Sequence, residues 1–288
     1  MTIACCLVLP EGVIFSADST ASEGEDGRYH YLDHNQKIYE LGEDSTLGVM
    51  TWGLAGLGGT SHRTVIARVA DQFKEKPPTS VKDGTERLMN AVWDTFQSEF
   101  DDEINEYDEM HSRAMEAARK ESSQRSKRDD DRLRVLQEDM SVGFCVGGYT
   151  EPSREPEAFS FEINPTLRSK PGVYPVIDQL IKGQPEYYYR LYDGRGESVR
   201  DKILKSGMWK GPISLLDKIL NEEVIEHPTL NIRDGIDFAH FIVYSTIKTI
   251  KFSNRNQVCG GPIEVAAITT DRNFRWVKHK TFDAAIDQ

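Results

Sequence analysis

Two short apolar runs joined by a turn open the chain and constrain its fold more than any other feature. Residues 3–9 read IACCLVL, residues 13–17 read VIFSA, and Pro10, Glu11 and Gly12 separate them. Both runs have the length of a strand, and Pro and Gly are typical of the turn between two strands. We therefore expect a β-hairpin that is buried on at least one face.

Strand alternation assigns the first residues to opposite faces of this hairpin. One face should carry Thr2, Ala4 and Cys6, and the other Ile3, Cys5 and Leu7. We expect both cysteines to pack in the core, because no base is evident that would activate either thiol.

Composition and charge exclude several classes of function. The net charge of -12 argues against a general nucleic-acid binder, whose affinity would come from clustered Lys and Arg. No apolar run is long enough to cross a bilayer, and the first run lacks the basic leader of a signal peptide. The four cysteines, Cys5, Cys6, Cys145 and Cys259, have neither a disulfide nor a metal spacing. We expect reduced thiols in a cytoplasmic protein.

Further along the chain, strand and helix patterns alternate in groups. Apolar residues recur at helical spacing from Thr60 to Pro77 and from Leu88 to Phe100, and this second helix could continue through Ala118. The polar segment 23–35 is expected to be a loop or a protruding turn. Other expected strands lie in 37–41, 45–56, 141–148, 157–163, 263–270 and 275–280, and a third helix in 236–252.

This order predicts an α+β fold. Two central sheets with helices outside satisfy it, and the short joins between strands favour antiparallel pairing. No linker divides the chain, so we expect one domain over residues 1–288 with a helical excursion at about 80–140. Residues 119–132 are almost wholly polar or charged, which is typical of a solvated helix extension or a disordered crest, with a binding surface as the alternative.

The first residues also suggest a catalytic chemistry. If Met1 is removed, Thr2 carries a hydroxyl and a free α-amine, whose pKa lies near 8 in model peptides. Such an amine can accept the hydroxyl proton and so activate the nucleophile. Lys37 would lower the pKa of the amine by charge repulsion, and Asp18 would anchor that lysine. A backbone N–H in the segment 53–59 could stabilise the oxyanion.

Taken together, these segments resemble proteasome β-type subunits. The opening TIACCLVLPEGVIFSADSTAS is similar to the family's start, HNQKIYEL to its segment with the catalytic lysine, and GVMTWGLAG to its oxyanion turn. The resemblance points to Lys37, and to Gly53 with Gly56 as the alternative. Residues 235–277 resemble the family's last helix and final strand pair. Overall the resemblance covers roughly residues 2–73, 141–192 and 230–276.

The resemblance has departures as well. The family's Gly-Ser-Gly falls at KGQPEYYY, residues 182–189, where the serine that supports the nucleophile's amine is missing. Either Asp234 or Asp237 could match the aspartate that assists it. Among relatives, the HslV peptidase and the bacterial proteasome homologue Anbu are the most similar in style. The helical insert and the aromatic PEYYYRLYDG favour Anbu.

The resemblance implies an N-terminal nucleophile (Ntn) hydrolase with a four-layer αββα sandwich. Thr2, Asp18 and Lys37 would be catalytic, and the Gly53 amide would hold the oxyanion. No metal or cofactor is required. We expect a threonine peptidase that cleaves peptide or protein substrates within a ring or helical homo-oligomer, with any ATPase partner unknown. The alternatives are a non-peptidase amide hydrolase and a catalytically silent assembly subunit.

Overall fold

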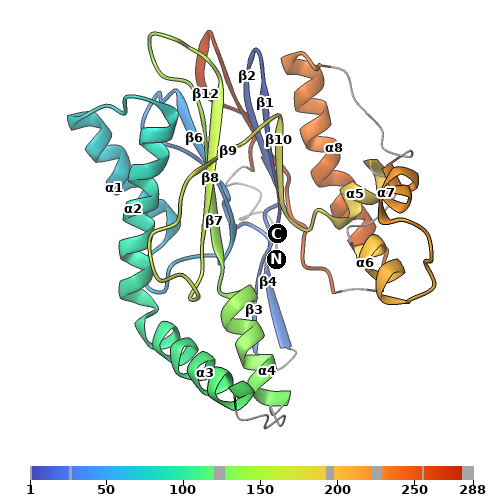
Figure 1. Ribbon diagram of the computed structural model, residues 1–288. Helices are drawn as coiled ribbons and strands as arrows, with labels where there is room; N and C mark the ends of the chain where they lie inside the picture. The colour runs from blue at the N-terminus through green and yellow to red at the C-terminus, as the bar shows by residue number, and fades with distance from the viewer. Residues whose placement is uncertain are drawn as a thin grey trace.

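The computed structural model describes residues 2–25, 28–119, 127–192, 198–221, 229–254 and 256–280. Within these ranges the fold is mixed, with antiparallel sheets between groups of helices (Figure 1). The predicted α and β composition and the antiparallel pairing are therefore confirmed.

The predicted N-terminal hairpin lies inside the first sheet. Strand β1 (Ile3–Leu9) pairs with β2 (Gly12–Ala17) on one side and with β10 (Gln179–Gly183) on the other. Strands β11 (Glu264–Thr269) and β12 (Arg272–Lys278) complete the order β10-β1-β2-β11-β12. Every residue of β2 is buried, which explains why its sequence is apolar almost throughout.

The second sheet has the order β5-β6-β7-β8-β9, again antiparallel. Its long central strands are β6 (Leu47–Gly53), β7 (Val142–Gly148) and β8 (Glu157–Ile163). The short outer strands are β5 (Ile38–Glu40) and β9 (Tyr174–Pro175).

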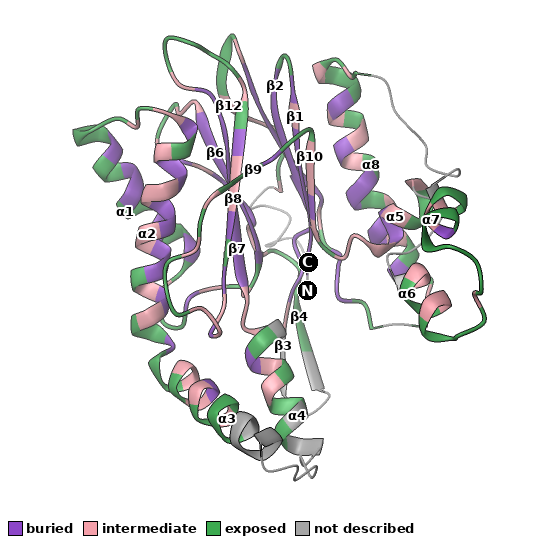
Figure 2. Cartoon of the chain, in the orientation of Figure 1, coloured by how far each residue is buried: buried purple, intermediate pink, exposed green. Residues whose placement is uncertain are grey.

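Helices cover the outer face of each sheet, as Figures 1 and 2 show. Helices α1 (His62–Glu75) and α2 (Val81–Glu99) begin at the N-caps Ser61 and Ser80 and share one apolar cluster with the second sheet. Helix α8 (Ile232–Lys251) packs on the first sheet and shares a second cluster with it.

A third apolar cluster lies between the sheets. It joins Ala4, Cys6 and Phe15 of the first sheet to Met50 and Cys145 of the second. The residues on the other face of β1 pack instead under α8, namely Ile3, Cys5 and Leu7. The alternation predicted for this strand is therefore confirmed.

The loop expected at residues 23–35 is partly a strand pair. Strands β3 (Ala21–Glu25) and β4 (Arg28–Leu32) pair in register, with Ala21 opposite Leu32. Their sequence has few apolar residues, so the hydrophobic pattern did not indicate a hairpin.

The second predicted helix does not continue to Ala118 without a break. It ends at Phe100, whose φ of -122° and ψ of 29° are not helical, and α3 (Asp101–Arg119) then leaves in a new direction (Figure 1). The side chain of Phe100 is buried in the cluster that α1 and α2 share with the second sheet. Phe100 therefore fits the spacing of apolar residues along the predicted helix, although its backbone ends that helix.

The charged segment 119–132 is partly helical. Helix α4 (Lys127–Arg134) and a π-helical turn, η1 (Val135–Asp139), lead back to β7, whereas residues 120–126 lie outside the described residues. Three shorter helices are α5 (Glu186–Tyr192), which packs against α8, and α6 (Ser198–Lys205) and α7 (Ile213–Asn221), which contact each other (Figure 1).

Candidate functional site

A buried ion pair joins two of the residues that the sequence singled out. The Nζ of Lys37 donates to Asp18 Oδ1 at 2.6 Å and to the carbonyl oxygen of Thr20 at 2.7 Å. The side chains of Lys37 and Asp18 are only 4% and 0% exposed. Charges are costly to bury, and a pair at this depth persists only when its hydrogen bonds are satisfied.

Backbone N–H groups donate the remaining hydrogen bonds to the Asp18 carboxylate. Its Oδ1 accepts from the N–H of Ile3 at 3.0 Å, and its Oδ2 accepts from Gly260 at 3.0 Å and Thr20 at 3.3 Å. Four donors on one side chain suit a carboxylate, which only accepts hydrogen bonds. They also fix the orientation of Asp18 relative to the first residues of the chain.

Thr2 lies at the same end of the hairpin as this ion pair. It is only 4% exposed, and it precedes Ile3, whose N–H binds Asp18 and whose carbonyl accepts from the Asp18 N–H at 3.1 Å. The structure therefore brings the predicted lysine and aspartate to the residue next to the predicted nucleophile. The catalytic roles of Thr2, Asp18 and Lys37 stay predictions.

Gly53 ends strand β6 near the same site. The carbonyl of Lys37 accepts from Thr51, two residues earlier on that strand, at 2.8 Å. Gly53 has a φ of +86°, and a Cβ at this position would lie 2.1 Å from the carbonyl oxygen of Ser141. This close approach of β6 to the residue before β7 requires a glycine by itself, so the oxyanion role of Gly53 stays a prediction.

The structure also identifies a glycine that the sequence did not single out for this site. Gly183 pairs with Ile3, has a φ of +92°, and would place a Cβ 1.8 Å from the carbonyl oxygen of Thr2. The sequence showed only that the expected serine was missing beside it. Gly183 therefore lets β10 approach the backbone of Thr2 more closely than any other residue could.

Asp234 lies away from Thr2. It belongs to the first turn of α8, where its carboxylate accepts from the Asn231 side chain. In that turn the N–H of Ile232 donates to Glu11 at 2.9 Å, at the turn of the β1–β2 hairpin, which is the opposite end of β1 from Thr2. Asp237 follows less than one helical turn later, so neither aspartate is placed to assist the amine.

The cysteines are structural. Cys5, Cys6, Cys145 and Cys259 are free and buried. Burial raises the pKa of the Cys5 and Cys259 thiols well above their usual value, and for Cys259 the nearby charge of Asp18 raises it further. Cys5 packs in the cluster under α8 and Cys6 in the cluster between the sheets, so the expected core packing of both is confirmed. A thiol that resists deprotonation is also a poor nucleophile.

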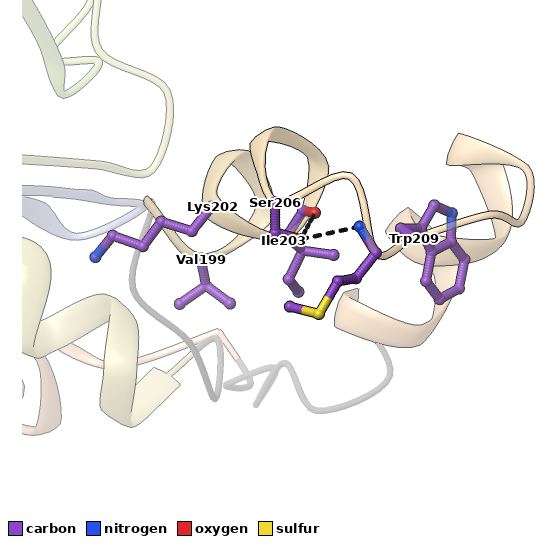
Figure 3. Close-up of a pocket in the computed structure, with 6 residues that line it drawn as sticks. Val199, Lys202, Ile203, Ser206 and Trp209 are labelled. Atoms are coloured by element: carbon purple, nitrogen blue, oxygen red, sulfur yellow. Dashed lines mark hydrogen bonds between the residues drawn. The ribbon is translucent and has the colours of Figure 1, made fainter.

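An apolar surface pocket of about 430 Å³ lies elsewhere, at the end of α6 (Figure 3). Val199, Ile203, Met208 and Trp209 contribute to its lining, and Ser206 accepts from the Met208 N–H at 3.2 Å. None of the predicted site residues lines this pocket, so its shape gives no support to the predicted chemistry.

Comparison with known proteins identifies fold relatives only. No protein-family model matches the sequence, and no curated protein matches it. Among solved structures, Anbu (ancestral beta-subunit) from Yersinia bercovieri is similar, with a TM-score of 0.51, 12% identity, and coverage of 99% of this chain and 90% of that one. Anbu from Hyphomicrobium sp. strain MC1 is similar at a TM-score of 0.48 and 12% identity, over 99% and 94% of the two chains.

At this identity the likeness to the Yersinia bercovieri protein shows a shared fold and nothing about activity. In the described ranges, no group of three or more His, Cys, Asp or Glu side chains could hold a metal ion. None of the helices described there combines the length and apolar character that a membrane span requires.

Proposed function

We propose that this chain is a threonine-type Ntn hydrolase that cleaves peptide bonds after removal of Met1. The observation that carries the proposal is the buried Lys37–Asp18 pair, because Asp18 also binds the N–H of Ile3, the residue next to Thr2. The desolvation cost of a buried ion pair can exceed its Coulombic gain, so the position of this pair beside Thr2 points to a purpose other than stability. Activation of an N-terminal hydroxyl is such a purpose.

In the proposed reaction, the α-amine of Thr2 accepts the proton of its own hydroxyl while the hydroxyl oxygen attacks the amide carbonyl. The tetrahedral intermediate collapses to an ester, and the amine's proton passes to the departing nitrogen. Water then attacks the ester, again with the amine as base, and releases the acid and the free hydroxyl. Lys37 stabilises the developing negative charge, and the N–H of Gly53 donates to the oxyanion.

The fold is consistent with this chemistry. Helices cover the outer faces of two stacked antiparallel sheets, and we propose that this is the four-layer αββα sandwich of Ntn hydrolases, formed by a single domain with the helical excursion at 80–140. Self-assembly into a proteasome-like homo-oligomer is part of the same proposal, with the resemblance to proteasome subunits as its support. Light scattering that finds only a monomer at micromolar concentration would contradict the assembly.

The test begins with the intact mass of the purified chain. A mass that lacks Met1 shows that the α-amine of Thr2 is free. A mass that includes Met1 rules the mechanism out, because the amine is then part of a peptide bond. A threonine-directed electrophile should then form an adduct that peptide mapping places on Thr2. Thr2→Ala should form no adduct, and its rate of substrate hydrolysis should fall by at least about a thousandfold. Thr2→Ser should retain adduct formation and hydrolysis, each at a lower level.

A substrate panel separates the two kinds of hydrolase. Fluorogenic peptides and single amino-acid amides are compared at matched concentration, because the same fold and nucleophile can serve either class. Turnover of peptides alone supports the peptidase. Turnover of amides alone indicates a small-molecule amidase. No turnover of either by a chain that lacks Met1 indicates a silent assembly subunit.

A further inference from the structure

A second ion pair, buried on its carboxylate side, lies next to the first. The side chain of Glu264, on β11, is fully buried, and its Oε2 lies 3.2 Å from the Nζ of Lys280. Its other oxygen, Oε1, lies 2.7 Å from Nδ1 of His279. The chemistry proposed for Thr2 does not use any of these groups.

Lys280 also holds the two segments that carry the first pair. Its Nζ donates to the hydroxyl of Ser19 at 3.2 Å and to the carbonyl of Asn35 at 2.9 Å. Ser19 directly follows Asp18, and Asn35 lies two residues before Lys37. The N–H of Asn35 donates to the carbonyl of Ser19 at 2.9 Å, so the segments meet where Lys280 binds them.

The charges of the two pairs act on one another. Burial lowers the pKa of Lys280, the carboxylate of Glu264 opposes that change, and the charge of Lys37 lowers the pKa further whereas that of Asp18 raises it. Other titratable groups that face these charges are His279, which lies against Glu264, and Asp33, which accepts from the Thr20 hydroxyl at 2.7 Å. Tyr39 and Cys259 face them as well: burial raises both pKa values, and the charge of Glu264 adds to the rise for Tyr39 and that of Asp18 to the rise for Cys259.

We propose that Glu264 and Lys280 are positioning residues of the Thr2 site. Lys280 holds Ser19 and Asn35 together, and the Glu264–Lys280 pair sets the electrostatic potential that the N-terminal amine experiences beside Asp18 and Lys37. This positioning role rests on the proposed function, in which the α-amine of Thr2 acts as the catalytic base.

The sign of the effect distinguishes this proposal from simple structural support. Glu264→Gln leaves the charge of Lys280 uncompensated, so the amine should lose its proton at a lower pH. Lys280→Met leaves the carboxylate uncompensated, so the amine should lose its proton at a higher pH. Each shift should be on the order of half a pH unit, and the double variant should return close to wild type.

The experiment uses the full chain released from an N-terminal fusion whose cleavage leaves Thr2 first. The rate at which cyanate carbamoylates the N-terminal amine is followed by mass spectrometry from pH 5 to pH 9, because only the unprotonated amine reacts. Peptide hydrolysis is measured on the same samples. Lys280→Arg keeps the charge and should retain the wild-type profile.

Two further variants serve as controls. Lys278→Met removes an equal charge two residues before Lys280, at the end of β12, where the lysine contacts His240 instead, and should leave the profile unchanged. If Lys280→Met does not fold, as thermal unfolding would show, Lys280→Gln keeps a donor without the charge and should shift the profile in the same direction.

Opposite shifts that cancel in the double variant support the proposal. Shifts in the same direction, or none beyond that of Lys278→Met, overturn it. The two proposals fail separately. Opposite shifts of carbamoylation without any hydrolysis remove the hydrolase and keep the positioning role, whereas hydrolysis with unshifted profiles does the reverse.

Discussion

The ammonium group of Lys37 and the carboxylate of Asp18 lie 2.6 Å apart although neither side chain is more than 4% exposed. Removing one member should leave the other charge buried and uncompensated. We expect Asp18→Asn and Lys37→Met each to lower the free energy of unfolding by about 3–5 kcal/mol. Urea denaturation of the two variants measures this loss.

The double variant Asp18→Asn with Lys37→Met should lose less stability than the sum of the single variants, because it buries no unpaired charge. Additive losses would show that the two side chains do not depend on each other. Surface pairs offer a matched control. Lys74→Met should change stability by less than about 1 kcal/mol, since Lys74 and Asp71 pair in solvent.

Gly183→Ala should disturb the Thr2 end of β1 specifically. The new Cβ would lie 1.8 Å from the carbonyl oxygen of Thr2, at a φ of +92° that alanine rarely adopts, so β10 must move away. We expect a loss of about 2 kcal/mol or more in stability and faster hydrogen exchange of the Ile3 amide. Gly172→Ala is the control, because its nearest contact is an ordinary 3.5 Å from Tyr174. Equal effects of the two variants would contradict the close approach.

His62 should make stability depend on pH in the acid range. Burial lowers the pKa of His62 to about 4, from 6.5 in a model peptide, so the unfolded chain binds a proton that the folded chain excludes. Stability from this group is complete above about pH 6.5 and is lost as the pH falls toward 4, by about 3 kcal/mol in total.

His62→Gln should lack this part of the pH dependence. Unfolding curves at pH 7 and pH 4.5 for the two proteins measure the difference. Because other groups also titrate over this range, the comparison is made between the variant and wild type. If both lose the same amount of stability, His62 takes up its proton in the folded state.

Glu99 should hold the turn that follows the predicted oxyanion glycine. Its carboxylate accepts from the N–H of Gly59 at 2.7 Å and from the Thr60 hydroxyl at 3.1 Å. We expect Glu99→Ala to speed hydrogen exchange of the Gly59 amide by about tenfold, which corresponds to about 1.4 kcal/mol. Exchange at the same rate as in wild type would show that the turn is held by its own backbone.

The sequence predicts those strands and helices in which the pattern of apolar residues extends along the whole element. Strands β1 and β2 are buried on both faces and are therefore continuous apolar runs. The helices α1, α2 and α8 each bury one face, so their apolar residues recur at a regular spacing. The sequences of β3 and β4 contain few apolar residues, and Phe100 ends a helix while keeping its apolar spacing. Local patterns carry no sign of either feature.

The candidate site divides in the same way. Asp18 and Lys37 could be named because both lie at strand ends near the start of the chain in a recognisable order. Gly183, Gly260 and the Glu264–Lys280 pair could not, because their contacts with residues 2–35 depend on which strands pair across the sheet. Strand pairing over such separations is decided by the whole packed structure.

The carboxylate of Asp18 accepts from an amide that lies 242 residues further along the sequence. During synthesis on the ribosome, the front of the chain emerges long before Gly260 and the strand after it. Until that last stretch leaves the exit tunnel, β2 lacks its β11 neighbour and Asp18 lacks one of its donors. A nascent chain thus exposes its threonine well before the surroundings of that residue are complete.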